Sequence, residues 1–305
     1  MQQPQIFLIR SNNKITLNIK ATDTPEHWSE IISPKGSLFD IRLKEVWRYR
    51  DLILLFVKRD LASQYRQTIL GPLWHIIQPV FTTFTFLVLF NKIAKISTDQ
   101  LPPVLFYMSS ITIWNYFSAC LNSTSGTFTS NAGIFGKVYF PRLVMPLSTI
   151  ISNMAKFGIQ LGLLICMILY YSFSGMYHVQ MGAHIFLLPV IVILMAGMGL
   201  GVGIIISSLT TKYRDLNIFI GFGVGLLMYI TPVAYPLSFL EQSQYKIFIQ
   251  WNPLTPLVEG FRYAVFGIGT FNSGMFIYSI CCTALFLFLG VMIFSKVERT
   301  FMDTV

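Results

Sequence analysis

Residues 58–79, KRDLASQYRQTILGPLWHIIQP, decide the fold of this chain. The first half has the basic and aliphatic residues of a helix on an anionic lipid surface: Lys58, Arg59, Arg66, Leu61 and Ile69. Gly71 and Pro72 then interrupt the helix, and proline is tolerated in the first turn of the next one. From Pro72 to Phe90 there is no charged residue. The stretch therefore predicts a segment that lies on a membrane, turns at Leu70-Gly71 and enters it.

Composition indicates a polytopic membrane protein. Of the 305 residues, 54% are hydrophobic and only 11% are charged, against roughly 25% charged in a typical soluble domain. A net charge of +9 would suggest nucleic acid for a soluble protein, but membrane topology explains it here, so no nucleic-acid partner is predicted. The cysteines lie in apolar runs without metal-site spacing and are interpreted as packing residues: Cys120, Cys166, Cys281 and Cys282.

Six apolar runs each come close to the roughly 20 residues that a bilayer core requires. They are Pro72–Phe90, Pro103–Leu121, Leu147–Tyr170, Ile185–Leu209, Leu216–Tyr235 and Phe276–Phe294. The predicted fold class is therefore all-α integral membrane, with six transmembrane helices. Three parts are predicted: an N-terminal cytoplasmic extension at 1–40, an amphipathic interfacial helix at 41–69 and a transmembrane domain at 70–305. In the extension, alternation of Ile15, Leu17 and Ile19 with polar residues indicates a short strand.

The loops fix the expected orientation, because cytoplasmic loops carry an excess of lysine and arginine. With the N-terminus inside, the opposite side holds only Lys92, Lys95, Lys246 and Arg262. All other basic residues outside the spans fall on the cytoplasmic side. The N-terminus lacks the apolar core of a signal peptide. Both termini are therefore predicted to be cytoplasmic.

Residues 41–67 have a helical pattern with two interpretations. The helix either packs on its own domain or lies at the membrane interface, with Trp47 and Tyr49 near the lipid headgroups. The second interpretation is favoured because a spanning run follows directly.

Two connections between spans are unusual. The cytoplasmic segment 127–146, TFTSNAGIFGKVYFPRLVMP, is rich in aromatic residues, and Asn131 is expected to cap a short helix that Pro141 ends. The external segment 236–273 is amphipathic and is divided by Trp251, Asn252, Pro253 and Pro256. It predicts a pair of short helices that dips into the membrane and returns, since such breaks survive there only when covered by protein or facing water.

Enzyme signatures are absent from the sequence. The four histidines form no metal-binding pair on one helix face, and no spanning run contains a carboxylate for proton or cation transport. Residues 133–138, GIFGKV, lack the spacing and the Ser or Thr of a phosphate loop. We therefore predict no catalytic residue, no metal and no cofactor in this chain, and expect any ATP to bind another subunit.

Three groups within the spans are open to a functional interpretation. A helical stripe of polar residues faces either a hydrated path or a neighbouring helix: Thr149, Asn153, Lys156 and Gln160. Aromatic residues either pack against lipid and protein or line a conduit along which sugar rings slide. The candidates for the conduit are Phe81, Phe84, Tyr107, Trp114, Tyr229 and Tyr235. Glycines four residues apart, Gly197 with Gly201 and Gly221 with Gly225, predict close helix packing.

Three stretches resemble the membrane permeases of bacterial polysaccharide-exporting ABC transporters, which move O-antigen, capsular or teichoic-acid-like polymers. They are WRYRDLILLFVKRDLASQYRQTILGPLWHIIQP, NAGIFGKVYFPRLVMPLS and WNPLTPLVEGFRYAVFG. The resemblance implies an interfacial helix and turn with Arg48, Lys58, Arg59, Leu70 and Gly71. It also implies a cytoplasmic coupling helix and an external re-entrant helical pair.

The resemblance further implies a homodimer in the bacterial inner membrane with two copies of a separate ATPase subunit that binds ATP and magnesium. The substrate would be a lipid-linked polysaccharide, and the first and fifth spans would shift at the dimer axis. The implied ATPase-coupling residues are Asn131, Phe135, Lys137, Val138, Tyr139, Phe140 and Arg142. We expect their aromatic side chains to be exposed to a groove of the partner or, alternatively, to the headgroup region. Phe140→Asp is expected to abolish export while leaving the protein inserted.

Two other functions fit the same sequence. One is a permease of this fold that exports a drug or a lipid. The other is a membrane transferase acting on a lipid-linked sugar, which would require paired carboxylates or a histidine near a membrane face.

Overall fold

The computed structural model describes residues 10–11, 14–15, 43–66, 68–135, 137–138, 140–177, 182–213, 215–240, 243–269 and 271–301. The chain divides into two units, Met1–Ser37 and Leu38–Val305. In the first unit, strand β1 (Arg10–Ser11) pairs antiparallel with β2 (Lys14–Ile15), and Arg10 lies opposite Ile15. The strand predicted around Ile15 to Ile19 is described only at its start, and the rest lies outside the described residues.

Every regular element described in the second unit is a helix, and five of its helices are long and apolar enough to cross a membrane. These candidate spans are Gly71–Ile93, Pro103–Ser125 (α4), Val144–Phe173 (α6), Ala183–Thr210 and Ser273–Val297. The fourth contains η3 (Ala183–Phe186) and α7 (Leu187–Thr210), and the last lies within α11 (Ser273–Phe301). Five of the six predicted spans are thus confirmed as helices of sufficient length.

The predicted fifth span is a shorter helix than the sequence suggested. It forms α8 (Leu216–Ile230), which has 15 residues, and Thr231 leaves the helix with extended backbone angles. At about 1.5 Å per residue this helix is roughly 22 Å long, less than the roughly 30 Å of a bilayer core. A sixth crossing therefore stays a prediction.

The predicted turn at Leu70-Gly71 is confirmed. Helix α1 (Leu43–Arg48) leads into α2 (Arg50–Tyr65), and the backbone then becomes extended at Arg66. Gly71 has a φ of +48°, a left-handed conformation that glycine adopts at little cost. Pro72 opens the 3₁₀ turn η1 (Gly71–Leu73), which continues into α3 (Trp74–Phe86) and a π-helical turn, η2 (Leu87–Ile93).

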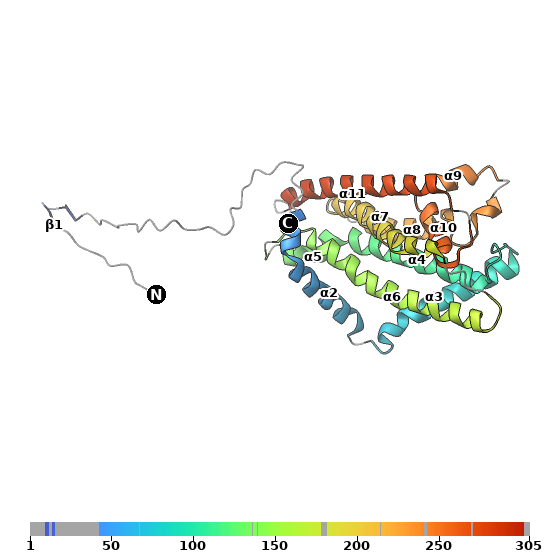
Figure 1. The fold of residues 1–305 in the computed structure, drawn as a ribbon. Coiled ribbons are helices and arrows are strands. Elements are labelled where there is room, and N and C mark those ends of the chain that lie inside the picture. The colour runs from blue at the N-terminus through green and yellow to red at the C-terminus, as the bar shows by residue number, and fades with distance from the viewer. Residues whose placement is uncertain are drawn as a thin grey trace. The chain divides into compact units, whose positions relative to one another are not determined.

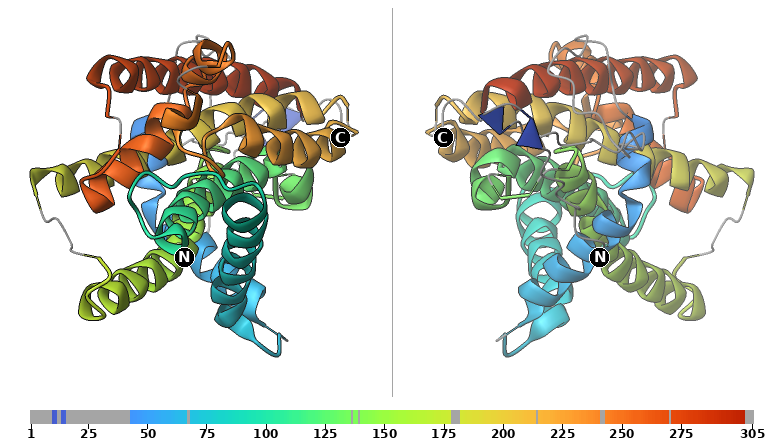
Figure 2. Two further views of the ribbon diagram at one scale, coloured as in Figure 1. Left: turned by 90° about the vertical axis from the view of Figure 1, so that its right-hand side faces the viewer. Right: turned by 90° about the vertical axis from the view of Figure 1, so that its left-hand side faces the viewer.

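Helix α4 is the centre of the bundle, with α3, α6, α7, α8 and α10 (Thr255–Phe266) packed against it (Figures 1 and 2). In its most apolar window 78% of the residues are buried, against 17 to 33% in the other four candidate spans. Its hydroxyl groups bond back to the carbonyls of the preceding turn, as Ser110 Oγ does to Phe106 O at 3.0 Å. Most of its buried hydroxyls are satisfied in this way, with the Tyr107 and Thr124 hydroxyls as exceptions, so the least hydrophobic span can occupy the core.

Glycines let α7 lie directly against α4 and α11. A Cβ atom on Gly199 would come within 2.8 Å of Cys120 Cβ, and one on Gly201 within 2.7 Å of the Phe286 carbonyl carbon. The predicted close packing at Gly197 and Gly201 is therefore confirmed. Close packing at the second predicted pair is not seen within this chain, because a Cβ on Gly221 or Gly225 would have no described atom within 4 Å.

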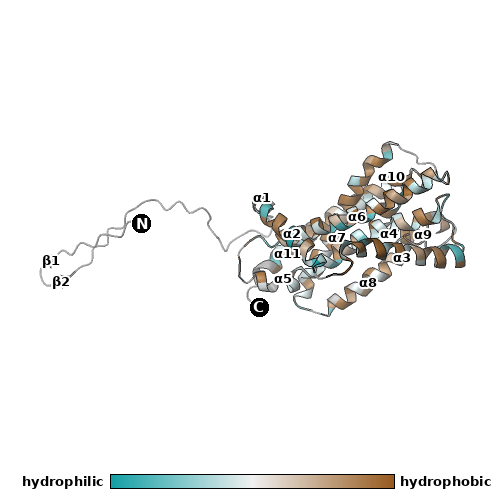
Figure 3. Cartoon of the chain, turned by 90° about the horizontal axis from the view of Figure 1, so that it is seen from below, coloured by the Kyte–Doolittle hydropathy of each residue, from teal (hydrophilic) through white to brown (hydrophobic). Residues whose placement is uncertain are grey.

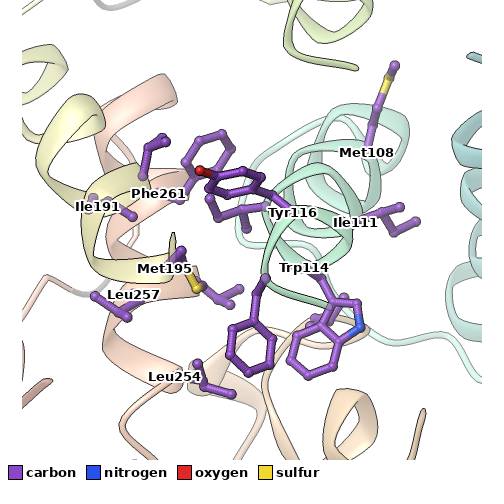
Figure 4. Close-up of a cluster of buried hydrophobic side chains, with 14 of the residues drawn as sticks. Met108, Ile111, Trp114, Tyr116, Ile191, Met195, Leu254, Leu257 and Phe261 are labelled. Atoms are coloured by element: carbon purple, nitrogen blue, oxygen red, sulfur yellow. The ribbon is translucent and has the colours of Figure 1, made fainter. Parts of the chain in front are cut away.

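The remaining helices close the two ends of the bundle. Helix α5 (Thr127–Phe135) follows α4 at one end, whereas η4 (Leu237–Leu240), α9 (Lys246–Gln250) and α10 lie at the other (Figure 1). Helix α10 is anchored in the core, where Leu257 and Phe261 lie beside Ile191 and Met195 of α7 (Figure 4). Apolar residues predominate along the long helices, and α1 is more hydrophilic (Figure 3).

Candidate functional site

The predicted coupling segment contributes to an aromatic cluster at the α5 end of the bundle. The cluster is formed by Phe56, Phe128, Phe135, Phe140 and Phe294. Ring centroids of neighbouring members lie 5.7 Å apart for Phe56 and Phe140, and 4.5 Å apart for the stacked rings of Phe128 and Phe294. Phe135 lies 5.8 Å from Phe140 and 6.0 Å from Phe128. The cluster therefore joins α2, α5 and the end of α11.

The expected exposure of the coupling aromatics is wrong for two residues. Phe135 is 3% exposed and Phe140 is 4% exposed. Their rings point into the chain because burying a phenylalanine in a packed cluster is worth more than leaving it in water. Tyr139 lies outside the described residues. Phe140→Asp would place a charge in an apolar core, so loss of export by this variant would not report on contact with a partner.

The surface of the coupling segment is formed by other residues. Lys137 and Val138 are exposed, and Val138 shows 57% of its surface. Asn131 was expected to cap a short helix, but it does not. It lies within α5 and donates from Nδ2 to the Thr127 carbonyl at 3.0 Å. Arg142 is buried with its guanidinium carbon 5.3 Å from the Phe135 ring centroid, a cation–π contact.

Helix α2 combines both sequence interpretations of residues 41–67. Phe56 and Val57 are buried, and the helix packs along α6. Leu54 and Leu55 of the same helix are exposed, at 54% and 58%, and so is Trp47 of the preceding helix α1, at 71%. The helix is thus packed on its own domain and still presents apolar side chains outward, which is suitable for a membrane interface.

The predicted interfacial residues lie along this helix and its turn. Arg48 and Lys58 are exposed. Arg59 bonds the neighbouring Asp60 at 2.8 Å and lies 4.7 Å from the Phe56 ring centroid. Across the turn, the rings of Tyr65 and His75 meet edge to face at 5.9 Å. Burial raises the pKa of Tyr65 above its ordinary value. Leu70 and Gly71 form the turn itself.

The six candidate conduit aromatics do not come together. Phe81, Phe84 and Tyr229 are exposed, whereas the Tyr235 hydroxyl donates to the Tyr229 carbonyl at 2.9 Å. Tyr107 and Trp114 are buried in the α4 core, so their expected contact with a conduit is wrong for this structure (Figure 4 shows Trp114). Helix α4 is surrounded by other helices, which the sequence pattern of a single span does not reveal.

The polar stripe on α6 makes a helix contact. Asn153 donates to Ser123 Oγ of α4 at 3.1 Å, and Gln160 Oε1 accepts from Asn115 of α4 at 3.4 Å. Lys156 Nζ donates to Asn153 Oδ1 at 2.9 Å and remains half-buried. Thr149 bonds within its own helix. Of the two interpretations, these contacts favour packing between helices over a hydrated path.

At the α9–α10 end the structure has a buried ion pair that sequence reasoning missed. Glu259 and Arg262 of α10 are 5% and 2% exposed and form a salt bridge. Arg262 also donates to Ser110 Oγ of α4 at 3.2 Å and lies 4.3 Å from the Phe106 ring centroid. The Leu237 N–H donates to Glu259 Oε1 at 3.0 Å. The signal in the sequence was a Glu and an Arg three residues apart in an apolar segment.

The electrostatics of this pair follow from its surroundings. Burial raises the pKa of the Glu259 carboxyl, and Arg262 and the Leu237 N–H act in the opposite direction. The described residues contain no group of three His, Cys, Asp or Glu that is able to hold a metal ion.

Comparison with known proteins gives consistent results. The family model described as ABC-2 type transporter matches residues 51–266. The O-antigen export system permease protein RfbA of Myxococcus xanthus is 27% identical over 225 residues, which cover 73% of this chain and 83% of that protein. RfbA of Klebsiella pneumoniae is 26% identical over 83% of this chain and 94% of its own length. The polysialic acid transport protein KpsM of Escherichia coli is 24% identical over 81% and 93%.

Proposed function

The chain belongs to the ABC-2 type transporter family, and from this membership we propose that it is the membrane permease of an exporter of lipid-linked polysaccharide. One observation carries the proposal. Relatives named for O-antigen export and for polysialic acid transport align with most of this chain and with more than four fifths of their own lengths. The five long apolar helices are consistent with a transport subunit.

We propose that the energy comes from a separate ATPase subunit that binds ATP and magnesium, in two copies on a homodimer of this chain. No complete phosphate loop exists in the sequence. The exposed Lys137 and Val138 would contact that subunit, supported from behind by the aromatic cluster. Arg142 and the buried phenylalanines would act by holding this surface, not by touching the partner.

The aromatic cluster suggests how force would travel. A packed core resists deformation, so pressure on α5 would move α2 and the end of α11 together with it. The turn at Gly71 connects α2 to α3, the first candidate span. In this proposal, ATP-driven movement at the coupling segment is passed through the turn to α3 and opens a path.

The path itself would lie between two copies of the chain. Phe81 and Phe84 on α3 and Tyr229 on α8 are exposed in the single chain and would face it. Aromatic faces suit the apolar CH surfaces of sugar rings and need no tight site. Tyr107 and Trp114 have no part in this path because they are buried.

The proposed location is the bacterial inner membrane, with both termini in the cytoplasm. The loop charges support this orientation, since the connection between the third and fourth predicted spans, residues 171–184, has no lysine or arginine. Under this orientation the α5 end of the bundle is cytoplasmic and the α9–α10 end is external.

Removal of this chain from the cell that makes it tests the proposal. We expect polysaccharide to accumulate inside the cell and to disappear from the surface, and a plasmid copy to restore it. Loss of the ATPase subunit is expected to have the same effect, because the permease has no energy source of its own. Unchanged surface polysaccharide, with loss of export of a drug or lipid instead, would contradict the proposed substrate class.

A further inference from the structure

A pocket opens at the α9–α10 end of the bundle, opposite the coupling segment. It is lined by residues of η4, α9, α10 and the start of α11, among them Lys246, Gln250, Glu259, Phe271 and Asn272. Lys246 and Gln250 are one helical turn apart and so share a face of α9. The pocket is therefore assembled from segments that are brought together only by the fold.

Several polar groups of the pocket make no hydrogen bond to the described part of the chain. Within the described residues, Lys246 Nζ, the Gln250 amide and Asn272 Nδ2 donate no hydrogen bond. Asn272 Oδ1, by contrast, accepts from the Gly274 N–H at 2.9 Å and the Met275 N–H at 3.3 Å. Within the described residues, both hydrogen bonds of Glu259 use Oε1, which leaves Oε2 as an acceptor. Donors and acceptors are thus both available at the pocket.

The charged groups that line the pocket or bond to its lining residues add up to no net charge. Lys246 lines it, and Arg262 is paired with Glu259. The fourth group is Asp99, whose Oδ1 accepts from Ser238 Oγ of the pocket at 2.6 Å. Two positive and two negative groups leave no net charge, so a strongly anionic or cationic ligand gains little from this site. A neutral ligand that both donates and accepts hydrogen bonds fits better.

The apolar part of the pocket completes the pattern. Phe271 lines it, and its ring stacks on the ring of Tyr263, with centroids 5.2 Å apart and planes 15° apart. An aromatic ring offers a face to the CH groups of a sugar, and the planar amides and the carboxylate oxygen match its hydroxyls. Lys246 is the one cation among the described lining residues.

We propose that this pocket binds neutral sugar units of the polymer at the external end of the permease. This inference rests on the proposed function, since the polymer is the sugar that would pass there. The pocket would hold successive sugar units weakly while the chain leaves.

Photo-crosslinking in living cells tests the proposal. A photoreactive amino acid replaces Met275, which lines the pocket, in the complete transporter, and the matched control replaces Ile277 on the same helix, which is 59% exposed and outside the lining. Only the first is expected to trap glycan, seen as a high-mass adduct that periodate removes. Equal glycan adducts at both positions, or a phospholipid adduct at Met275 instead of glycan, would overturn the proposal.

A second variant separates binding from folding. Asn272→Asp keeps the oxygen that caps α11 but removes the two amide donors, so we expect normal protein levels and a glycan adduct lowered about 5-fold, the factor for one lost hydrogen bond. An unchanged adduct would overturn the role of Asn272. If the wild-type chain supports export but traps no glycan at Met275, the pocket inference fails alone. If export does not depend on the chain, the proposed function fails.

Discussion

Phe140 illustrates how burial within the chain changes the role expected of a single residue. Its ring contacts Phe56 and Phe135 within the chain, and it is 4% exposed. Phe140→Ala is expected to destabilise the protein by about 3 kcal/mol or more, because a large buried side chain leaves a cavity. Thermal unfolding of the purified protein in detergent measures this loss.

Val138→Asp is the matched variant on the exposed surface of the same segment. We expect unchanged thermal stability, since Val138 is 57% exposed, and loss of polysaccharide export through weaker contact with the ATPase subunit. Co-purification with that subunit reports the contact. Full export by this variant would show that Val138 has no part in coupling.

The buried pair of Glu259 and Arg262 leads to a third prediction at this scale. Arg262→Met leaves a carboxylate buried without its partner, so we expect a loss of roughly 3–5 kcal/mol. The double variant Glu259→Leu, Arg262→Met removes both charges and is expected to be more stable than the single variant. Equal stability of the two variants in thermal unfolding would mean that the pair does not act as a unit.

At the scale of elements, the contacts of α7 depend on glycine. Gly201→Ala would place a Cβ 2.7 Å from the Phe286 carbonyl carbon of α11, so the helices must separate and thermal stability is expected to fall by about 1–3 kcal/mol. Gly221→Ala on α8 is the control, because no described atom lies within 4 Å of the added Cβ. The two variants differ only in position, so equal melting temperatures would contradict the close packing of α7 and α11.

At the scale of the whole molecule, the exposed face of α8 leads to a prediction about assembly. Phe222 is 65% exposed on this helix, beside the open Gly221 and Gly225. In a variant whose native cysteines are replaced, Phe222→Cys is expected to form a covalent dimer with a short bifunctional maleimide in native membranes. Ile193→Cys on α7, where Ile193 is 69% exposed, serves as the control and is expected to stay monomeric. Equal cross-linking at both positions would contradict the placement of α8 at the dimer axis.

The amino-acid sequence by itself determined the membrane class, five helices of spanning length, the turn at Leu70-Gly71 and two short helices between residues 236 and 273. These features depend on local properties. A long uncharged run, a glycine followed by a proline and a break between apolar segments act through neighbouring residues, so they can be recognised without knowing what lies beside them.

Only the tertiary structure decided which side of each element is covered. Phe140 is buried because α2, α5 and α11 meet around it, and Trp114 is buried because α4 is the central helix. In a membrane protein both the lipid-facing and the protein-facing residues are apolar, so hydrophobicity cannot distinguish the two sides. The bonds of Glu259 with Arg262 and Leu237, and of Arg262 with Ser110, likewise depend on three segments that come together only in the folded chain.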